Sequence, residues 1–262
     1  MGRLRLDKHY GDAILDDGTV VIFYSATLRL RLGLLALHYA SLATIRPCGT
    51  RELRQWLRAA PMTHGQAITA RCGDIALAWH SRGAATPDVV LHDEPAGALH
   101  WQARMPLAEV RITRAGESEA TGLGYFETLA IDLWPTRWPI RTLHWGRFTG
   151  RHTSLVWIVW EHEQPRQWLF LDGVPACLGH FDLPRSFAFT GAASGTLICG
   201  PARTLIAQPV SQRLRLLGPL RYGLPAMIRN LKEEKHMAPA RIAFSDGSED
   251  EGYVIFEKIV LA

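Results

Sequence analysis

The segment 122–150, GLGYFETLAIDLWPTRWPIRTLHWGRFTG, combines acids and arginines with aromatic residues in one short span. In an extended strand, residues two apart share a face, so Tyr125 and Glu127 would lie together beside Leu129 and Ile131. A carboxyl group among apolar side chains is disfavoured as an anion, and it can then remain protonated and act as a general acid. The segment therefore predicts an acid that transfers a proton in an apolar site.

The second half of this segment supplies groups that would stabilise charge. In TLHWGRF, Trp145 and Arg147 share one face of a strand. The rings of Trp145 and Tyr125 would stabilise a carbocation, while Arg147 would hold Glu127 or a polar group of the substrate. In the alternative interpretation, Glu127 and Arg147 form a structural ion pair and the aromatic residues only pack around it. The residues alone leave both interpretations open.

Motifs of other enzyme classes are absent. The sequence has no phosphate loop, no dinucleotide-binding glycine motif after a strand, no HExxH and no GxSxG. It has 11 histidines, but no two are spaced as a close ligand pair, so we expect packed or solvated histidines and no metal site.

The elements that position these residues are predicted to be strands. From Val20 to Leu32 the even positions are apolar and the odd positions become polar, as in an antiparallel strand with one wet face. Similar short segments recur to the end of the chain, separated by turn-forming residues, which predicts a sandwich or a barrel. Two segments favour helices instead: 50–60, which starts on a capping Thr50, and 224–237, which is rich in helix formers.

A boundary between two units is predicted in DLWPTRWPIR, residues 132–141. Two prolines within five residues interrupt the strand pattern there and favour an extended connection. We expect one domain in residues 1–135 and a second in residues 136–262, each large enough for a barrel.

Charge and cysteine usage restrict the partners and the compartment. The net charge of +4 is spread along the chain and forms no basic stripe, so we expect no nucleic-acid partner. The 4 cysteines form no CxxC pair and no signal peptide precedes them, which predicts reduced thiols and a cytoplasmic location. The most apolar stretch, 28–43, is interrupted by Arg29 and Arg31, so we expect no stable membrane insertion and at most peripheral contact. Monomer and dimer both remain open.

Two segments resemble a known family. The N-terminal DKHYGDAILDDGTVVIFYSATL is similar to the opening of the carotenoid 1,2-hydratase and AttH group of lipocalin-like proteins, with a turn of the L-DG type before an apolar strand. The middle segment resembles that family's second hallmark, G-GY followed by W-WGR. With the strand pattern, this resemblance implies an all-β fold: two lipocalin-like antiparallel β-barrels packed side by side, with one or two short helices, and a hydrophobic pocket in or between the barrels.

The resemblance assigns residues position by position. Tyr125 matches the tyrosine of GY, and Trp145 and Arg147 match WGR. The family usually has a His-Asp or similar acidic pair after GY, whereas this chain has only Glu127 and Asp132 there.

The N-terminal match adds Asp12, with His9 and Tyr10 where the family has Trp and Tyr. The predicted catalytic acids are Glu127, Asp132 and Asp12. The predicted substrate-binding residues are Tyr125, Trp145, Arg147, Tyr10, His9 and Trp157.

The resemblance implies an enzyme without a metal or an organic cofactor. It would act on a hydrophobic terpenoid or polyene by acid-initiated hydration or cyclisation of a C=C bond. The alternatives are a Diels-Alderase-type pericyclase, whose pocket shapes a flexible polyene, and a non-catalytic carrier of hydrophobic ligands.

Overall fold

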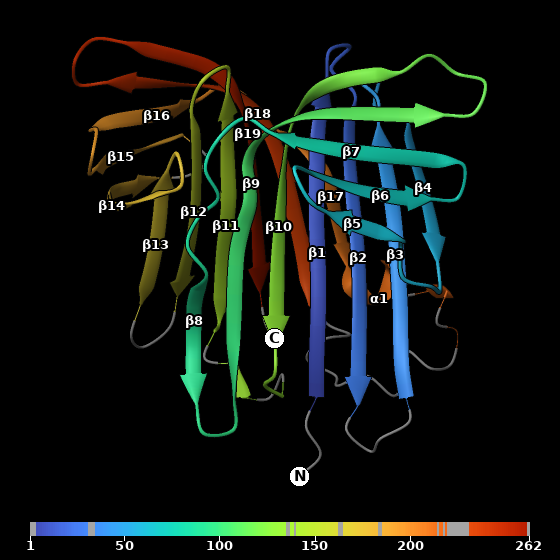
Figure 1. The fold of residues 1–262 in the computed structure, drawn as a ribbon. Coiled ribbons are helices and arrows are strands. Elements are labelled where there is room, and N and C mark those ends of the chain that lie inside the picture. Colours follow the sequence, from blue (N-terminus) through green and yellow to red (C-terminus); the bar gives the residue numbers. More distant parts are fainter. Residues whose placement is uncertain are drawn as a thin grey trace. The chain divides into compact units, whose positions relative to one another are not determined.

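The computed structural model in Figure 1 shows an all-β chain, as predicted. It describes residues 4–30, 35–134, 137–138, 140–161, 165–182, 185–213, 215–216, 218 and 231–260. The chain divides into two compact units, Met1–Arg137 and Trp138–Ala262. Each unit is a single antiparallel sheet built around its own apolar core.

The N-terminal unit is a curled sheet. Its strands are β1 (Leu4–Leu15), β2 (Val20–Leu30), β3 (Leu35–Ile45), β4 (Arg51–Trp56), β5 (Met62–His64), β6 (Ala67–Cys72), β7 (Ile75–Ser81), β8 (Val89–Glu94), β9 (Gly97–Arg114) and β10 (Ala120–Ile131). Their order is β4-β3-β2-β1-β10-β9-β7-β6-β5, and β8 pairs with β9. Alternate residues such as Phe23, Trp79 and Phe126 point inward and form the core. In the described residues β4 and β5 do not pair, so this sheet curls without closing.

The C-terminal unit closes into a barrel. It contains β11 (Thr142–Gly150), β12 (Ser154–Glu161), β13 (Arg166–Leu171), β14 (Val174–Asp182), β15 (Ser186–Thr190), β16 (Gly195–Cys199), β17 (Arg203–Pro209), α1 (Val210–Arg213), β18 (Lys232–Phe244) and β19 (Glu249–Val260). Strands β11 to β16 follow in order, and β16–β18, β18–β19 and β19–β11 pairings close a ring of eight strands. Phe148, Trp157 and Phe187 lie in its interior.

The turn between β11 and β12 is held by a carboxylate from β19. Asp250 accepts hydrogen bonds from the backbone N–H groups of Arg151, His152 and Thr153 at 3.0, 3.0 and 2.8 Å. One side chain thus satisfies three consecutive donors that the turn leaves without a strand partner.

The predicted helix over residues 50–60 is wrong. Arg51–Trp56 forms β4, which pairs with β3 along its whole length, so the neighbouring strand overrides the local helix preference. The second predicted helix, over residues 224–237, is wrong in its last part, because Lys232–Met237 begins β18. Residues 224–230 lie outside the described residues. In the described part of the chain, no helix is long and apolar enough to cross a membrane.

Candidate functional site

Two buried carboxyl groups lie on one face of the N-terminal sheet. In the register of β1 with β10, Tyr10 lies opposite Glu127 and Asp12 lies opposite Tyr125. Directly opposed residues share a face, so these four side chains lie together, on the face opposite the core residue Phe126. Tyr10 and Asp12 are each 1% exposed, Glu127 is 5% exposed and Tyr125 is 0% exposed. We call them the carboxyl–tyrosine cluster.

Each carboxyl group in this cluster is hydrogen-bonded to a phenol. The Tyr125 hydroxyl donates to Oε2 of Glu127 at 2.8 Å, and the Tyr10 hydroxyl donates to Oδ2 of Asp12 at 2.7 Å. A third donor, Nε1 of Trp101, lies 2.6 Å from the same Oε2 of Glu127. Burying a carboxyl group is costly without such partners, and with them Glu127 is fixed in one orientation.

Trp101 was not among the predicted site residues. It pairs with Leu129, two residues beyond Glu127 on β10, so it reaches the carboxyl group diagonally across the sheet. The alternation in GALHWQARM would have placed Trp101 on a buried face, but nothing in the sequence pairs that segment with β10.

Aromatic rings extend the cluster toward β2. The ring centroid of Tyr10 is 5.0 Å from that of Tyr24 and 6.2 Å from that of Tyr125. The ammonium group of Lys8 lies 5.2 Å from the Tyr24 centroid and 5.8 Å from the Tyr10 centroid. The faces of these two rings can therefore contact a cation, and in this structure the ammonium group of Lys8 is the cation that they contact.

The two predicted residues of β11 are buried in the C-terminal unit. Arg147 is 0% exposed and donates from Nη1 to the Thr149 hydroxyl at 2.7 Å. Trp145 has the ammonium group of Lys235 4.7 Å from its ring centroid, and Lys235 forms a buried ion pair with Glu257 at 2.6 Å. The face of Trp145 thus contacts a cation of its own unit. The Arg147–Glu127 contact remains a prediction.

Three predicted residues do not join the cluster. The Asp132 side chain is 41% exposed and lies 3.7 Å from Arg5, so it is a surface acid beyond the end of β10. His9 points to the opposite face of β1 from Tyr10, because adjacent strand residues alternate, and its ring lies 6.2 Å from that of Phe126. Trp157 is a core residue of the closed barrel.

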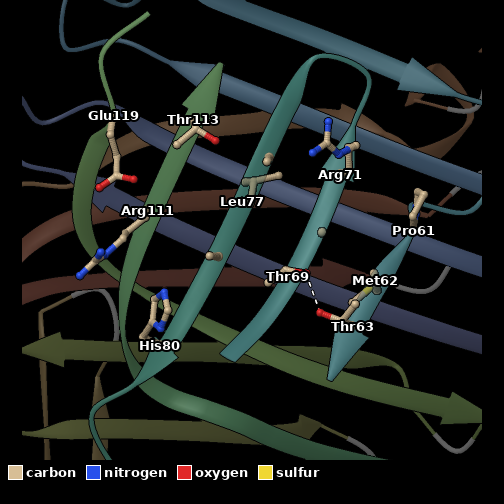
Figure 2. Close-up of a pocket in the computed structure, with 13 residues that line it drawn as sticks. Pro61, Met62, Thr63, Thr69, Arg71, Leu77, His80, Arg111, Thr113 and Glu119 are labelled. Carbon is tan, nitrogen blue, oxygen red and sulfur yellow. Dashed lines mark hydrogen bonds between the residues drawn. The ribbon is translucent and has the colours of Figure 1, made fainter. Parts of the chain in front are cut away.

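A separate groove of about 580 Å³ lies on the outer face of the N-terminal sheet. Figure 2 shows its lining from β5, β6, β7 and β9, including a hydrogen bond between the hydroxyls of Thr63 and Thr69. The side chains of Ala76 and Ala78 are small, so the surface is hollow at this position. Arg71 and other longer side chains border the groove. None of the predicted site residues lines this groove. Among the residues that the structure describes, no group of three His, Cys, Asp or Glu side chains is placed to hold a metal ion.

Comparison with solved structures shows the same fold in three proteins. CghA with Sch210972 has a TM-score of 0.62 and 11% identity, over 98% of this chain and 89% of that chain. A candidate AttH protein from Nitrosomonas europaea has a TM-score of 0.52 and 12% identity, over 97% and 92% of the two chains. Kievitone hydratase from Nectria haematococca has a TM-score of 0.53 and 8% identity, over 98% and 89%. No known family profile and no curated protein matches the sequence. At these identities the comparisons establish the fold, which is the one that the sequence resemblance implies.

Proposed function

We propose that this chain is an enzyme that protonates a C=C bond of a hydrophobic terpenoid or polyene and works without a metal or an organic cofactor. The observation that carries the proposal is the buried Glu127, oriented by Tyr125 and Trp101 beside further aromatic rings. The fold shared with kievitone hydratase supports an addition of water as one outcome.

In the proposed step, the carboxyl group of Glu127 gives its proton to one alkene carbon. The π electrons form the new C–H bond, and the other carbon becomes a tertiary cation. The ring of Tyr125, on the same sheet face as Glu127, stabilises this cation. The donors Tyr125 and Trp101 stabilise the carboxylate that remains, because hydrogen bonds to an ionised acceptor are stronger than those to a neutral one.

The cation is then captured in one of two ways. Water adds to it and loses a proton, which completes a hydration. Alternatively, a second C=C bond of the substrate attacks it, and the resulting cation returns a proton to the Glu127 carboxylate, which completes a cyclisation. We assign Asp12, the second buried carboxyl group of the cluster, to accept the proton from water.

A pericyclase is the second candidate function. The observation that favours it is the TM-score of 0.62 with CghA, whose structure contains Sch210972. In that case the aromatic cluster would fold a flexible polyene, without any transfer of a proton to carbon.

Isotope labelling separates these candidates. The protein is incubated with an acyclic carotenoid, a prenylated phenol and a linear polyene, in H₂O and in D₂O, and the products are analysed by mass spectrometry. A hydratase adds the mass of one water and places deuterium on carbon, and a proton-initiated cyclase places deuterium on carbon without adding water. A pericyclase forms a product without carbon-bound deuterium. Recovery of every compound unchanged, with saturable binding, would support a carrier instead.

The acid is tested by Glu127→Gln, with Asp132→Asn as the matched control. Glutamine keeps the shape and can still accept from Tyr125 and Trp101, but it cannot supply the proton. We expect turnover to fall about 10²- to 10⁴-fold while substrate binding persists, and we expect the exposed Asp132 variant to keep full turnover. An unchanged rate in Glu127→Gln would remove Glu127 as the acid.

A further inference from the structure

A group of basic side chains gathers on the core side of the N-terminal sheet, away from the carboxyl–tyrosine cluster. The rings of His9 on β1 and His64 on β5 have centroids 5.8 Å apart and an interplanar angle of 43°. Nδ1 of His9 is buried and has no hydrogen-bond partner among the described residues. Buried polar atoms almost always have a partner, so this nitrogen indicates a group that the protein itself does not supply.

Arg104 adds a fixed positive charge to the two histidines. Arg104 lies on β9, at the point where the register with β10 shifts between Phe126 and Glu127. Strand β10 separates β9 from β1. By strand alternation Arg104 shares a face with Gln102, which lies in line with Thr128 and His9 across the sheet, and its charge lowers the pKa of His9 and that of His64. In the described part of the chain, no hydrogen bond or ion pair engages the side chain of Arg104.

The positive charge of Arg104 determines whether this group of side chains would bind a cation or an anion. Two imidazoles alone would suit a transition metal, but the neighbouring Arg104 repels a cation and attracts an anion. Burial is the main cause that lowers the pKa of His9; His64 and Arg104 lower it further, and Asp7 opposes them. The pKa of His64 is lowered as well, so both imidazoles are neutral near pH 7. The Asp7 carboxylate is already paired with Arg5 and Arg29, so the positive charge of Arg104 is left to attract an anion.

We propose that His9, His64 and Arg104 form a binding site for the carboxylate of a small apolar acid. The carboxylate would accept hydrogen bonds from the imidazole N–H groups and from the guanidinium group, and it would satisfy Nδ1 of His9. The imidazole of His9 lies beside the buried ring of Phe126, with the two centroids 6.2 Å apart, so the surroundings of this site are apolar. This site is on the other face of β1 from Glu127 and does not depend on the proposed catalysis.

The test uses the chain of 262 residues and sodium benzoate as the probe, with NMR of the imidazole ring protons. Benzoate is expected to shift the His9 and His64 signals saturably and to raise the pKa of both, because a bound anion favours the imidazolium form. For the same reason benzoate is expected to bind more tightly at pH 6 than at pH 8.

Matched variants separate this site from general surface charge. Arg104→Gln is expected to weaken benzoate binding about tenfold or more, the usual effect of losing a hydrogen bond to a charged group. Arg111→Gln removes the same charge from the same strand, at the groove and beside Glu109, and is expected to leave binding unchanged. His64 is exposed, so His64→Gln is expected to fold normally and to weaken binding as well.

Four results would overturn the proposal. They are the absence of a saturable shift with benzoate, equal affinity in Arg104→Gln and the unmodified protein, tighter binding of inorganic phosphate than of benzoate at pH 8, and tight binding of Ni²⁺ to the two histidines in place of benzoate. The first two would remove the anion site, the third would make it a phosphate site, and the fourth would make it a metal site.

Discussion

Replacing Gly146 by alanine is expected to destabilise the C-terminal barrel. Gly146 on β11 lies directly opposite Trp157 on β12, and the indole ring covers it inside the barrel. An added Cβ would lie 2.2 Å from Cζ2 and 2.4 Å from Cε2 of that ring. Carbon atoms in contact are about 3.5–4.0 Å apart, so the ring would have to move by more than about 1 Å.

The size of the effect follows from how firmly this ring is held. Trp157 is 0% exposed and its ring centroid is 5.0 Å from that of Phe187. Overpacking such a core costs about 1–3 kcal/mol, and we expect about 2–3 kcal/mol because a closed barrel has no free edge along which to relax. For a unit of this size the midpoint of thermal unfolding would fall by roughly 8–12 °C.

The assay is urea unfolding followed by tryptophan fluorescence and near-UV circular dichroism. The control is Gly65→Ala, where the nearest atom to the added Cβ is 4.0 Å away, and it is expected to change the free energy of unfolding by less than about 0.5 kcal/mol. A smaller ring relieves the overlap, so Gly146→Ala combined with Trp157→Phe is expected to cost about 1–2 kcal/mol less than the sum of the two single changes. Wild-type stability of Gly146→Ala, or strict additivity in the double variant, would show that the ring does not pack on Gly146.

Three further predictions concern a turn, the thiols and the response to acid. Asp250→Ala should lower the free energy of unfolding by about 1–3 kcal/mol, because three backbone donors lose their acceptor; unchanged urea unfolding would contradict this. When the protein is treated with iodoacetamide at pH 8, peptide mass spectrometry should find Cys48 modified first. Hydrogen bonds from Thr50 lower the pKa of this exposed thiol, so more of it is present as the reactive thiolate. Cys72 and Cys199 should stay unmodified because burial raises the pKa of each to about 11, and their early labelling would show that these thiols are accessible. Burial also lowers the pKa of His9 in the folded state, so the unfolded chain binds the proton more readily. The stability that this neutral imidazole contributes is therefore complete above about pH 6.5 and is lost as the pH falls toward the pKa of His9 in the folded state. Urea titrations at pH 7.5 and 5.5 measure this effect. Between these two pH values, the free energy of unfolding should fall less in His9→Gln than in the unmodified protein.

Much of the fold was readable in the sequence because strand periodicity is a local property. Successive side chains of a strand alternate between faces, so the pattern from Val20 onward identified β2. The same rule placed Tyr125 and Glu127 on one face, and the structure has them hydrogen-bonded there. It also required His9 and Tyr10 to face opposite ways, although the resemblance assigned both to one site.

The partner of each strand was decided only by the tertiary structure. Tyr10 meets Glu127 because β1 pairs with β10, and Trp101 reaches Glu127 because β9 lies on the other side of β10. Residues 50–60 have a good helical sequence, yet they form a strand because β3 offers its hydrogen-bonding edge. Local pattern determines which face a side chain occupies, whereas its neighbours come from strands far away in the sequence. The carboxyl–tyrosine cluster therefore exists only after the sheet has assembled.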